Sequence, residues 1–145
     1  MQAHFRLARP VRDIRRTQEM YCQGLDLRVL GSFLDHQGFD GVMLGRAGLP
    51  WHVEFTRCRF HPMAPAPTQE DLLVFYLPDL GQWLAQCEQM LAAGFKAANA
   101  FNPYWNERGR SFEDLDGYRI VLQNAAWENQ EAPDRADTPD HMSGV

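Results

Sequence analysis

The chain repeats one order of structural signals in its two halves, and this repeat limits the possible folds more than any other feature. Each half has a strand, a helix that ends at a glycine followed by an apolar residue, and then several strands. Gly24-Leu25 ends the first helix and Gly94-Phe95 the second, and the turn at Asp40-Gly41 has its counterpart at Asp116-Gly117. Two such βαβββ modules predict an α+β fold in which curved mixed sheets form a cup, with helices on the outside.

The first module is expected over about residues 4–60, where apolar periodicity and β propensity change in the order of one βαβββ unit. Its expected elements are a strand at 5–11, a helix from Asp13, a turn at 39–41, and strands at 27–34, 42–44 and 51–58. A stretch with three prolines leads out of this module, which indicates a linker at about 61–69.

The second module is expected over about residues 70–127. An apolar run at 71–77 has the length of a strand, and Asp79 is placed to cap the helix that follows. Apolar side chains at spacings of three and four continue this helix toward Gly94, a residue type common at helix ends. The remaining expected elements are strands at 95–104 and 118–124, a polar loop at 106–110, and a turn at Asp116-Gly117.

Composition narrows the class of protein. The chain has 145 residues, of which 45% are hydrophobic, so a single globular domain over 1–127 is expected. A net charge of −5 does not provide the positive surface that binds nucleic acids. No apolar run of the sequence is long enough to span a membrane. The segment 128–145 has five acidic residues and one arginine, which predicts a flexible, solvated tail.

The cysteines and the N-terminal residues indicate the compartment. Cys22, Cys58 and Cys87 are odd in number and widely spaced, which is typical of reduced thiols rather than of disulfides or a zinc site. The first residues have no apolar segment of the kind found in secretory signals. We therefore expect a cytoplasmic protein.

Three motifs occur in an order that one superfamily shares: MYCQGLDL at 20–27, FYLPD at 75–79 and FEDLDGY at 112–118. They resemble the vicinal oxygen chelate superfamily, which includes glyoxalase I, bleomycin-resistance proteins, fosfomycin thiol transferases and extradiol dioxygenases. GFDGVMLG at 38–45 and FNPYW at 101–105 resemble a bacterial glyoxalase-like subgroup. Leu115 departs from the third motif, which usually has proline there. The resemblance implies the two-module cup and a homodimer.

The resemblance also implies where the metal-dependent members bind a divalent ion. Aligning the motifs places the four ligand positions on Arg6, Glu54, Leu72 and Val121. Only Glu54 is a metal ligand by chemistry, because a guanidinium stays protonated and leucine and valine have no donor atoms. We therefore expect no metal and no other cofactor, with Arg6 supplying the positive charge beside Glu54.

Strand alternation predicts which side chains share the cup with Glu54. His52 lies on the same face of its strand, and Arg110, in the polar loop, is a candidate clamp for an anionic ligand. The expected polar lining consists of Arg6, His52, Glu54, Asn102, Tyr104 and Gln123. The expected apolar floor consists of Leu72, Val74, Tyr76 and Val121.

Three functions follow as hypotheses. The first is a protein that binds a small molecule in the cup without a metal. The second is a lyase, isomerase or dioxygenase that uses His52 as base and Glu54 as its orienting group, or a rearranged metal site. The third is an interaction module whose own side chains fill the cup. In a purely structural interpretation, Arg6 and Glu54 form an ion pair, His52 is a hydrogen-bonded wall residue, and the remaining histidines, including His4, are exposed to solvent.

Overall fold

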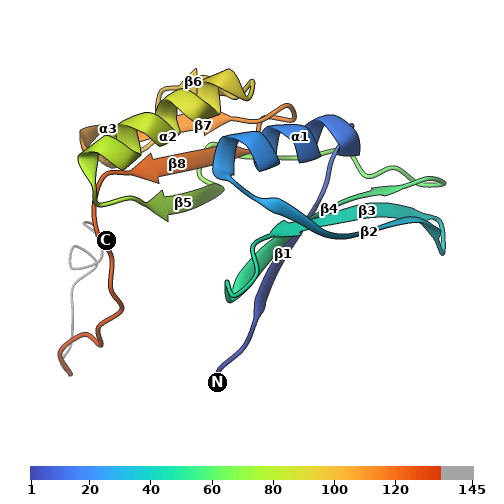
Figure 1. The fold of residues 1–145 in the computed structure, drawn as a ribbon, viewed down its shortest axis with the longest axis horizontal. Helices are drawn as coiled ribbons and strands as arrows, with labels where there is room; N and C mark the ends of the chain where they lie inside the picture. The colour runs from blue at the N-terminus through green and yellow to red at the C-terminus, as the bar shows by residue number, and fades with distance from the viewer. Residues whose placement is uncertain (135–145) are drawn as a thin grey trace.

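A computed structural model describes residues 1–134 of the chain. The first module contains β1 (Phe5–Pro10), α1 (Ile14–Leu25), β2 (Arg28–His36), β3 (Phe39–Gly45) and β4 (Trp51–Cys58). Its strands form one sheet in the order β1-β4-β3-β2, in which β1 runs parallel to β4 and the other neighbours are antiparallel (Figure 1). The sheet is therefore mixed and open.

The second module repeats this architecture. It contains β5 (Leu72–Tyr76), α2 (Leu80–Ala92), β6 (Lys96–Ala98), α3 (Tyr104–Glu107), β7 (Gly109–Glu113) and β8 (Arg119–Gln123). The order of its sheet is β5-β8-β7-β6, and β5 runs parallel to β8. The predicted α+β class with two βαβββ modules is confirmed, and the short helix α3 between β6 and β7 is an addition to it.

Local signals in the sequence fix the starts of both long helices and the end of α2, whereas α1 continues past Gly24 to Leu25 and ends at Asp26, which has a positive φ of 57°. Asp13 Oδ1 accepts a hydrogen bond of 3.0 Å from Arg16 N at the start of α1, and Asp79 Oδ2 accepts one of 2.8 Å from Gln82 N at the start of α2. Gly94 follows α2 with a φ of 102°, a conformation that glycine adopts without strain. The predicted cap at Asp79 and the helix end at Gly94 are confirmed.

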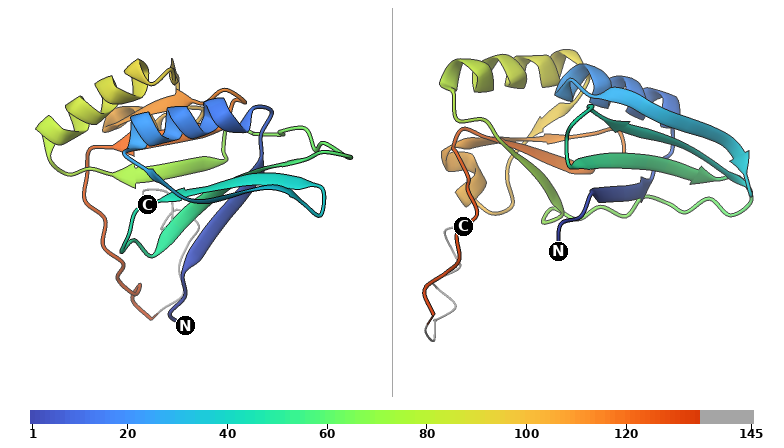
Figure 2. Two further views of the ribbon diagram at one scale, coloured as in Figure 1. Left: turned by 45° about the vertical axis from the view of Figure 1, so that its right-hand side comes forward. Right: turned by 60° about the horizontal axis from the view of Figure 1, so that its bottom comes forward.

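The two helices pack against each other on the same side of the two sheets and join the modules (Figures 1 and 2). Tyr21 of α1 is fully buried, and its ring centroid lies 4.7 Å from that of Phe55 and 5.3 Å from that of Phe95. Gly24 permits this approach, because a Cβ atom there would lie 2.7 Å from Phe95 Cε2 and 3.0 Å from Met90 Sδ. One core therefore extends across both modules.

The connection between β6 and β7 differs from the prediction. The strand expected at 95–104 is confined to Lys96–Ala98, and α3 and the start of β7 replace the loop expected at 106–110. Asn102 stabilises the break, because its Oδ1 accepts a hydrogen bond from Tyr104 N and its carbonyl oxygen accepts one from Trp105 N. The assignment of Asn102 and Tyr104 to a strand is therefore wrong.

Smaller differences concern turns and the ends of the chain. The turn expected at 39–41 lies at Gln37 and Gly38, which have positive φ values, and Phe39 already begins β3. Residues 59–71 form neither helix nor strand. The end of the expected flexible tail, 135–145, lies outside the described residues, and so does His141. Within residues 1–134, no helix has the length and hydropathy needed to cross a membrane.

Candidate functional site

Each sheet turns one face toward the helices and the core, and we call the opposite face its distal face. On the first sheet, Val53 and Phe55 of β4 are buried in the core, so alternation places His52 and Glu54 on the distal face. On the second sheet, Ile120 and Leu122 of β8 are in the core. The distal residues there are Leu72, Val74, Tyr76, Gly109, Ser111, Glu113, Arg119, Val121 and Gln123.

Four side chains form a polar cluster on the distal face of the first sheet. Arg6 Nη1 lies 3.4 Å from Glu54 Oε2, and Arg6 Nε donates a hydrogen bond of 2.8 Å to His52 Nε2. His4 Nε2 lies 2.6 Å from His52 Nδ1. The side chain of Glu54 is 13% exposed and that of Arg6 is 49% exposed, so the carboxylate is nearly buried beneath a guanidinium that still reaches solvent. The structure thus brings together Arg6, His52 and Glu54.

The hydrogen bonds determine which nitrogen of His52 holds the ring proton. A guanidinium only donates, so His52 Nε2 accepts from Arg6, and the proton of the neutral ring sits on Nδ1 and is donated to His4. Burial lowers the pKa of His52, and the charge of Arg6 lowers it further, which keeps the ring neutral near pH 7. Both ring nitrogens are engaged, so His52 accepts a proton from a ligand only after Arg6 moves.

His4 is the member of this cluster that the sequence analysis missed. It was expected in solvent, and it is exposed, but its ring also contacts His52 with the centroids 4.8 Å apart. The parallel pairing of β1 with β4 sets Arg6 opposite His52, and His4 lies two residues before Arg6. The signal was therefore the same period of two that connects His52 with Glu54.

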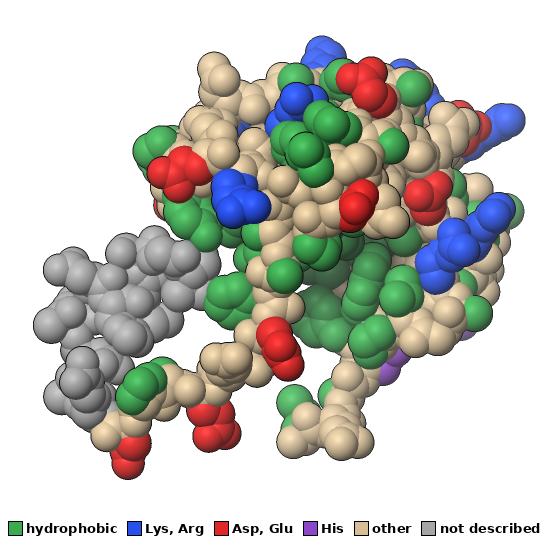
Figure 3. All heavy atoms as spheres, turned by 60° about the vertical axis from the view of Figure 1, so that its left-hand side comes forward, with side chains coloured by type: hydrophobic (Ala, Val, Ile, Leu, Met, Phe, Trp, Pro, Cys, Tyr) green, Lys and Arg blue, Asp and Glu red, His purple; other side chains and the backbone are tan. Residues whose placement is uncertain are grey.

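An apolar groove of about 280 Å³ lies between the edge strands β1 and β5 of the two sheets. Its lining consists of Phe5, Leu7, Trp51, His52, Val53, Leu72, Leu73, Val74 and Phe75. We call it the inter-sheet groove. His52 is the one titratable side chain in this lining. The rings of Trp51 and Phe75, with centroids 5.6 Å apart, also line a second cavity of about 260 Å³. Figure 3 shows the hollow between the sheets with hydrophobic side chains around it.

The distal face of the second sheet is less accessible, because the segment 99–107 covers it. A Cβ atom on Gly109 would lie 2.6 Å from the carbonyl oxygen of Trp105 and would collide with Gln123 Oε1. Gln123 is 3% exposed, and in the described part of the chain this Oε1 atom has no hydrogen-bond partner. Asn102 and Tyr104, expected on cup strands, belong to this cover, while Gln123 lies on β8 beneath it.

Tyr76 and Arg110 are the remaining residues of the predicted site. Tyr76 lies on the distal face of β5 with its ring centroid 6.0 Å from that of Trp127, and burial raises the pKa of its hydroxyl. Arg110 belongs to strand β7 and faces α2, with its guanidinium carbon 4.9 Å from the centroid of the Trp83 ring. The expectation that Arg110 lies in a polar loop, as a clamp over the cup, is therefore wrong. Alternation along the strand at 109–113 directs this side chain toward α2 rather than toward the cup.

The residues at the four metal positions do not fit a divalent ion. Arg6 places a guanidinium against Glu54, the one carboxylate among them, and Leu72 and Val121 offer no donor atom. Over residues 1–134, no group of three histidine, cysteine, aspartate or glutamate side chains has an arrangement that could hold a metal ion. Instead of metal ligands, these positions provide the fixed positive charge and the hydrogen-bond donors of Arg6.

Comparisons with known proteins match both modules. The model of the YycE-like N-terminal domain matches residues 5–56, and that of the YycE-like C-terminal domain matches residues 70–124. The protein YycE of Bacillus subtilis (strain 168) is 37% identical over 123 residues, which cover 85% of this chain and 88% of that protein.

Solved structures share the same two-module fold. The crystal structure of YycE from Bacillus subtilis has a TM-score of 0.78 and 34% identity, covering 92% of this chain and 95% of that chain. The fosfomycin resistance protein FosX from Mesorhizobium loti has a TM-score of 0.65 and 15% identity, with coverages of 83% and 90%. TnmS3, an antibiotic binding protein from Streptomyces sp. CB03234, has a TM-score of 0.58 and 17% identity, with coverages of 85% and 94%. At such identities FosX and TnmS3 share the fold alone.

Proposed function

The chain belongs to the YycE-like family and has the fold of the vicinal oxygen chelate superfamily, and we propose that it binds a small organic molecule in the inter-sheet groove without a divalent metal. The observation that carries this proposal is an apolar groove of about 280 Å³ with the polar cluster at its edge through His52. Ligand sites in proteins combine these two features, a mostly apolar wall and a few convergent polar groups.

The lining suggests the chemistry of the ligand. Aromatic and aliphatic side chains, among them Trp51 and Phe75, favour a flat apolar body. Beside them, Arg6 is half-exposed and has N–H groups beyond those used by His52 and Glu54. We therefore expect an aromatic or aliphatic molecule with an acceptor or anionic group directed at Arg6.

The absence of metal in this proposal rests on the replacement of the ligands. Arg6 neutralises Glu54 where a cation would otherwise do so, and this pairing requires no bound ion. TnmS3 is named an antibiotic binding protein, and its likeness in fold supports a binding role as a class. The alternative of a base-catalysed enzyme has less support, because both nitrogens of His52 are engaged.

The fluorescent dye 1-anilinonaphthalene-8-sulfonate, ANS, tests the proposal, because it combines an aromatic body with an anionic group. We expect saturable binding at one site, unchanged by EDTA. Val74→Trp fills the groove and should abolish binding, while Leu80→Trp, at a residue that is 57% exposed and outside the groove, should leave it intact. Arg6→Met should weaken binding about tenfold, through loss of a charged hydrogen bond. Equal binding by the Val74→Trp variant, or loss of binding in EDTA, would contradict the proposal.

The homodimer implied by the resemblance is part of the same proposal. Leu34, Phe60 and Met63 are 80%, 72% and 71% exposed, and apolar side chains of this size favour a covered surface. Light scattering coupled to gel filtration should give twice the mass of the chain. A mass of one chain across the accessible concentration range would refute the dimer and leave the groove untouched.

A further inference from the structure

A smaller cavity of about 70 Å³ lies on the distal face of the second sheet, beneath the cover segment 99–107. Its lining shares only Leu72 with the inter-sheet groove. This volume is the space open to the centre of a water molecule, and about 10–15 Å³ of it holds one water. The cavity therefore has room for about five waters or for a ligand with as many non-hydrogen atoms. The polar cluster of the first sheet contributes nothing to it.

The side chain of Ser111 indicates that a hydrogen-bonding group is missing from this cavity. The residue is 3% exposed, lies on the distal face of β7 and lines the cavity. Its Oγ atom has no hydrogen-bond partner among the residues that the structure describes. Buried hydroxyl groups in folded proteins almost always have a partner. The missing partner of Ser111 therefore belongs in the cavity.

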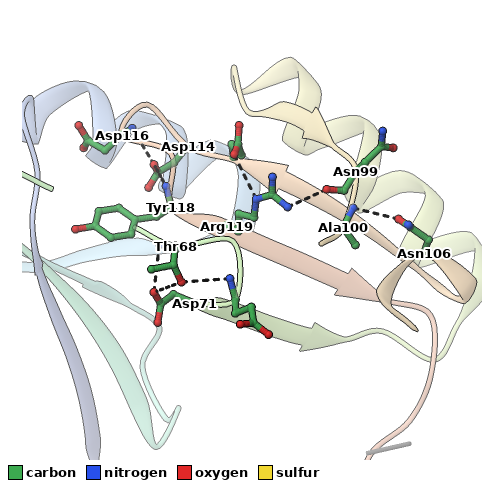
Figure 4. Close-up of polar contacts among 11 residues, drawn as sticks. Thr68, Asp71, Asn99, Ala100, Asn106, Asp114, Asp116, Tyr118 and Arg119 are labelled. Atoms are coloured by element: carbon green, nitrogen blue, oxygen red, sulfur yellow. Dashed lines mark hydrogen bonds and ion pairs between the residues drawn. The ribbon is translucent and has the colours of Figure 1, made fainter. Parts of the chain in front are cut away.

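Arg119 of β8 lies on the same face, diagonal to Ser111 because it pairs with Glu113, and it is 6% exposed and also lines the cavity. Its Nη1 donates a hydrogen bond of 2.8 Å to the carbonyl oxygen of Asn99, and its Nε lies 3.3 Å from Glu113 Oε2 (Figure 4). These contacts use two of the five N–H groups of a guanidinium that stays charged at all physiological pH values. A buried arginine with donors to spare is a typical site for an anionic group.

Hydrogen bonds hold the cover segment over these two residues. The carbonyl oxygen of Asn99 fastens it to Arg119, and within it Ala100 N donates to Asn106 Oδ1 at 3.4 Å (Figure 4). Asn102 lines the cavity from the same segment. Glu70, an exposed residue of the chain that leads into β5, also lines the cavity. The cavity thus has hydrogen-bond donors on the sheet and an acidic residue of another segment in its lining.

We propose that this cavity binds a small carboxylic acid of two or three carbons, with its carboxylate on Ser111 and Arg119. Both side chains donate hydrogen bonds there, and the fork of a guanidinium matches the two oxygens of a carboxylate. An amino or hydroxyl group at the other end of the ligand is directed at Glu70. This proposal is independent of the proposed function, because it uses the second sheet and a different ligand chemistry.

Isothermal titration calorimetry of the full chain with glycolate, glycine and glycolamide tests the site. Glycolate and glycine each have five non-hydrogen atoms, which matches the size of the cavity. We expect one of them or both to bind with a stoichiometry of one, and glycolamide, the uncharged analogue of glycolate, to give no binding. Tighter binding of glycine would assign an amino acid, and tighter binding of glycolate a hydroxy acid.

Two variants locate the binding at this cavity. Ser111→Ala removes the unpartnered hydroxyl group, so the fold should persist and the affinity for the carboxylate should fall about tenfold. Ser32→Ala is the matched control on the exposed strand β2 and should bind as the wild type does. Arg119→Lys keeps the charge but loses the fork, and should weaken the same ligand. A thermal melt of each variant verifies folding.

Three outcomes would overturn the proposal. The first is a lack of saturable heat with both acids, which would mean that waters alone fill the cavity. The second is an unchanged affinity in the folded Ser111→Ala variant. The third is displacement of ANS by the acid, or a loss of acid binding in Arg6→Met, since either would place the acid at the polar cluster of the first sheet.

Discussion

The distal faces of the two modules differ, although the modules have the same order of strands. On the first sheet, Arg6 and the other members of the polar cluster lie on an accessible face next to the inter-sheet groove. On the second sheet, the segment 99–107 covers the corresponding face and leaves a cavity of about 70 Å³. The repeat fixes the backbone of both sheets, and the chemistry that each face presents depends on what covers it.

The connection between the second and third strand of each module accounts for this difference. In the first module, β2 ends at His36 and β3 begins at Phe39, so the hairpin is tight. In the second module, β6 ends at Ala98 and β7 begins at Gly109, and α3 lies in between. A longer loop costs little additional conformational entropy, so a fold tolerates such an insertion. The insertion converts an open face into a covered one.

Because the two modules share one core, they should unfold together. A substitution in this core should lower the free energy of unfolding more than any of the other substitutions. Phe55 is fully buried against Tyr21, and Phe55→Ala should lower the free energy of unfolding by about 3–5 kcal/mol. Hydrogen exchange followed by mass spectrometry should show β4 and β8 losing protection at the same denaturant concentration. Leu80→Ala, at a residue that is 57% exposed, is the control. Separate transitions for the two modules would refute a common core.

Removal of the cover should make the second face resemble the first. Trp105 is half-buried in the cover and lines the small cavity. Trp105→Ala should cost about 2 kcal/mol of stability, less than for a fully buried tryptophan, and should add a second class of ANS sites. Urea unfolding and ANS titration measure the two effects. Unchanged ANS binding with unchanged stability would mean that the segment does not act as a cover.

The ion pair of the first face should contribute a smaller amount. Arg6→Met should lower the free energy of unfolding by about 1 kcal/mol, because the guanidinium is half-exposed and solvent screens the pair. Glu54→Gln in the same background should add little further loss, since the carboxylate no longer has its partner. A double-mutant cycle measured by urea unfolding gives the coupling. Strictly additive effects of the two substitutions would show that the pair is not coupled.

Acidification should change the contributions of His52 and Asp114 to the free energy of unfolding in opposite directions. Folding lowers the pKa of His52, chiefly through burial. The contribution of the neutral His52 ring to stability is therefore complete above the ordinary pKa of 6.5 and is lost as the pH falls toward the lowered pKa. His52→Gln should therefore flatten this decline in stability below about pH 6.5. Urea unfolding at several pH values measures it, and an identical pH profile in the variant would contradict the assignment.

Asp114 of the second module should show the reverse, with the smallest effect. Burial raises the pKa of this carboxyl, although Tyr21 donates a hydrogen bond of 2.7 Å to its Oδ2. The folded state then binds the proton more tightly, so stability rises as the pH falls from the raised pKa toward the ordinary value of 3.8. Asp114→Asn should remove this rise in the same unfolding series. A rise of equal size in the variant would assign it to another group.

The sequence predicts those parts of the fold that depend on local chemistry. Asp79 at a helix start and Gly94 at a helix end act through neighbouring backbone groups, so their positions follow from the sequence. The sequence does not indicate strand β7, because it is short and has one large apolar residue, Phe112, among polar ones. Its strand character comes from pairing with β6 and β8, which lie elsewhere in the chain.

The same distinction applies to the candidate site. Glu54 and His52 share a face by the period of two, and the resemblance to a known superfamily added Arg6, which the structure places against both. His4 joins them through the period of two from Arg6 together with the register between β1 and β4, a pairing between residues about fifty positions apart. The cover by 99–107 was not predictable from alternation, because it depends on how Asn102 ends the strand-like run.

A crystal structure of the protein with ANS would show whether the inter-sheet groove binds its ligand without a metal. We expect the naphthalene ring in the inter-sheet groove, the sulfonate near Arg6 and His52, and no metal density at Glu54. A metal ion coordinated by Glu54, or dye bound outside the groove, would contradict this expectation.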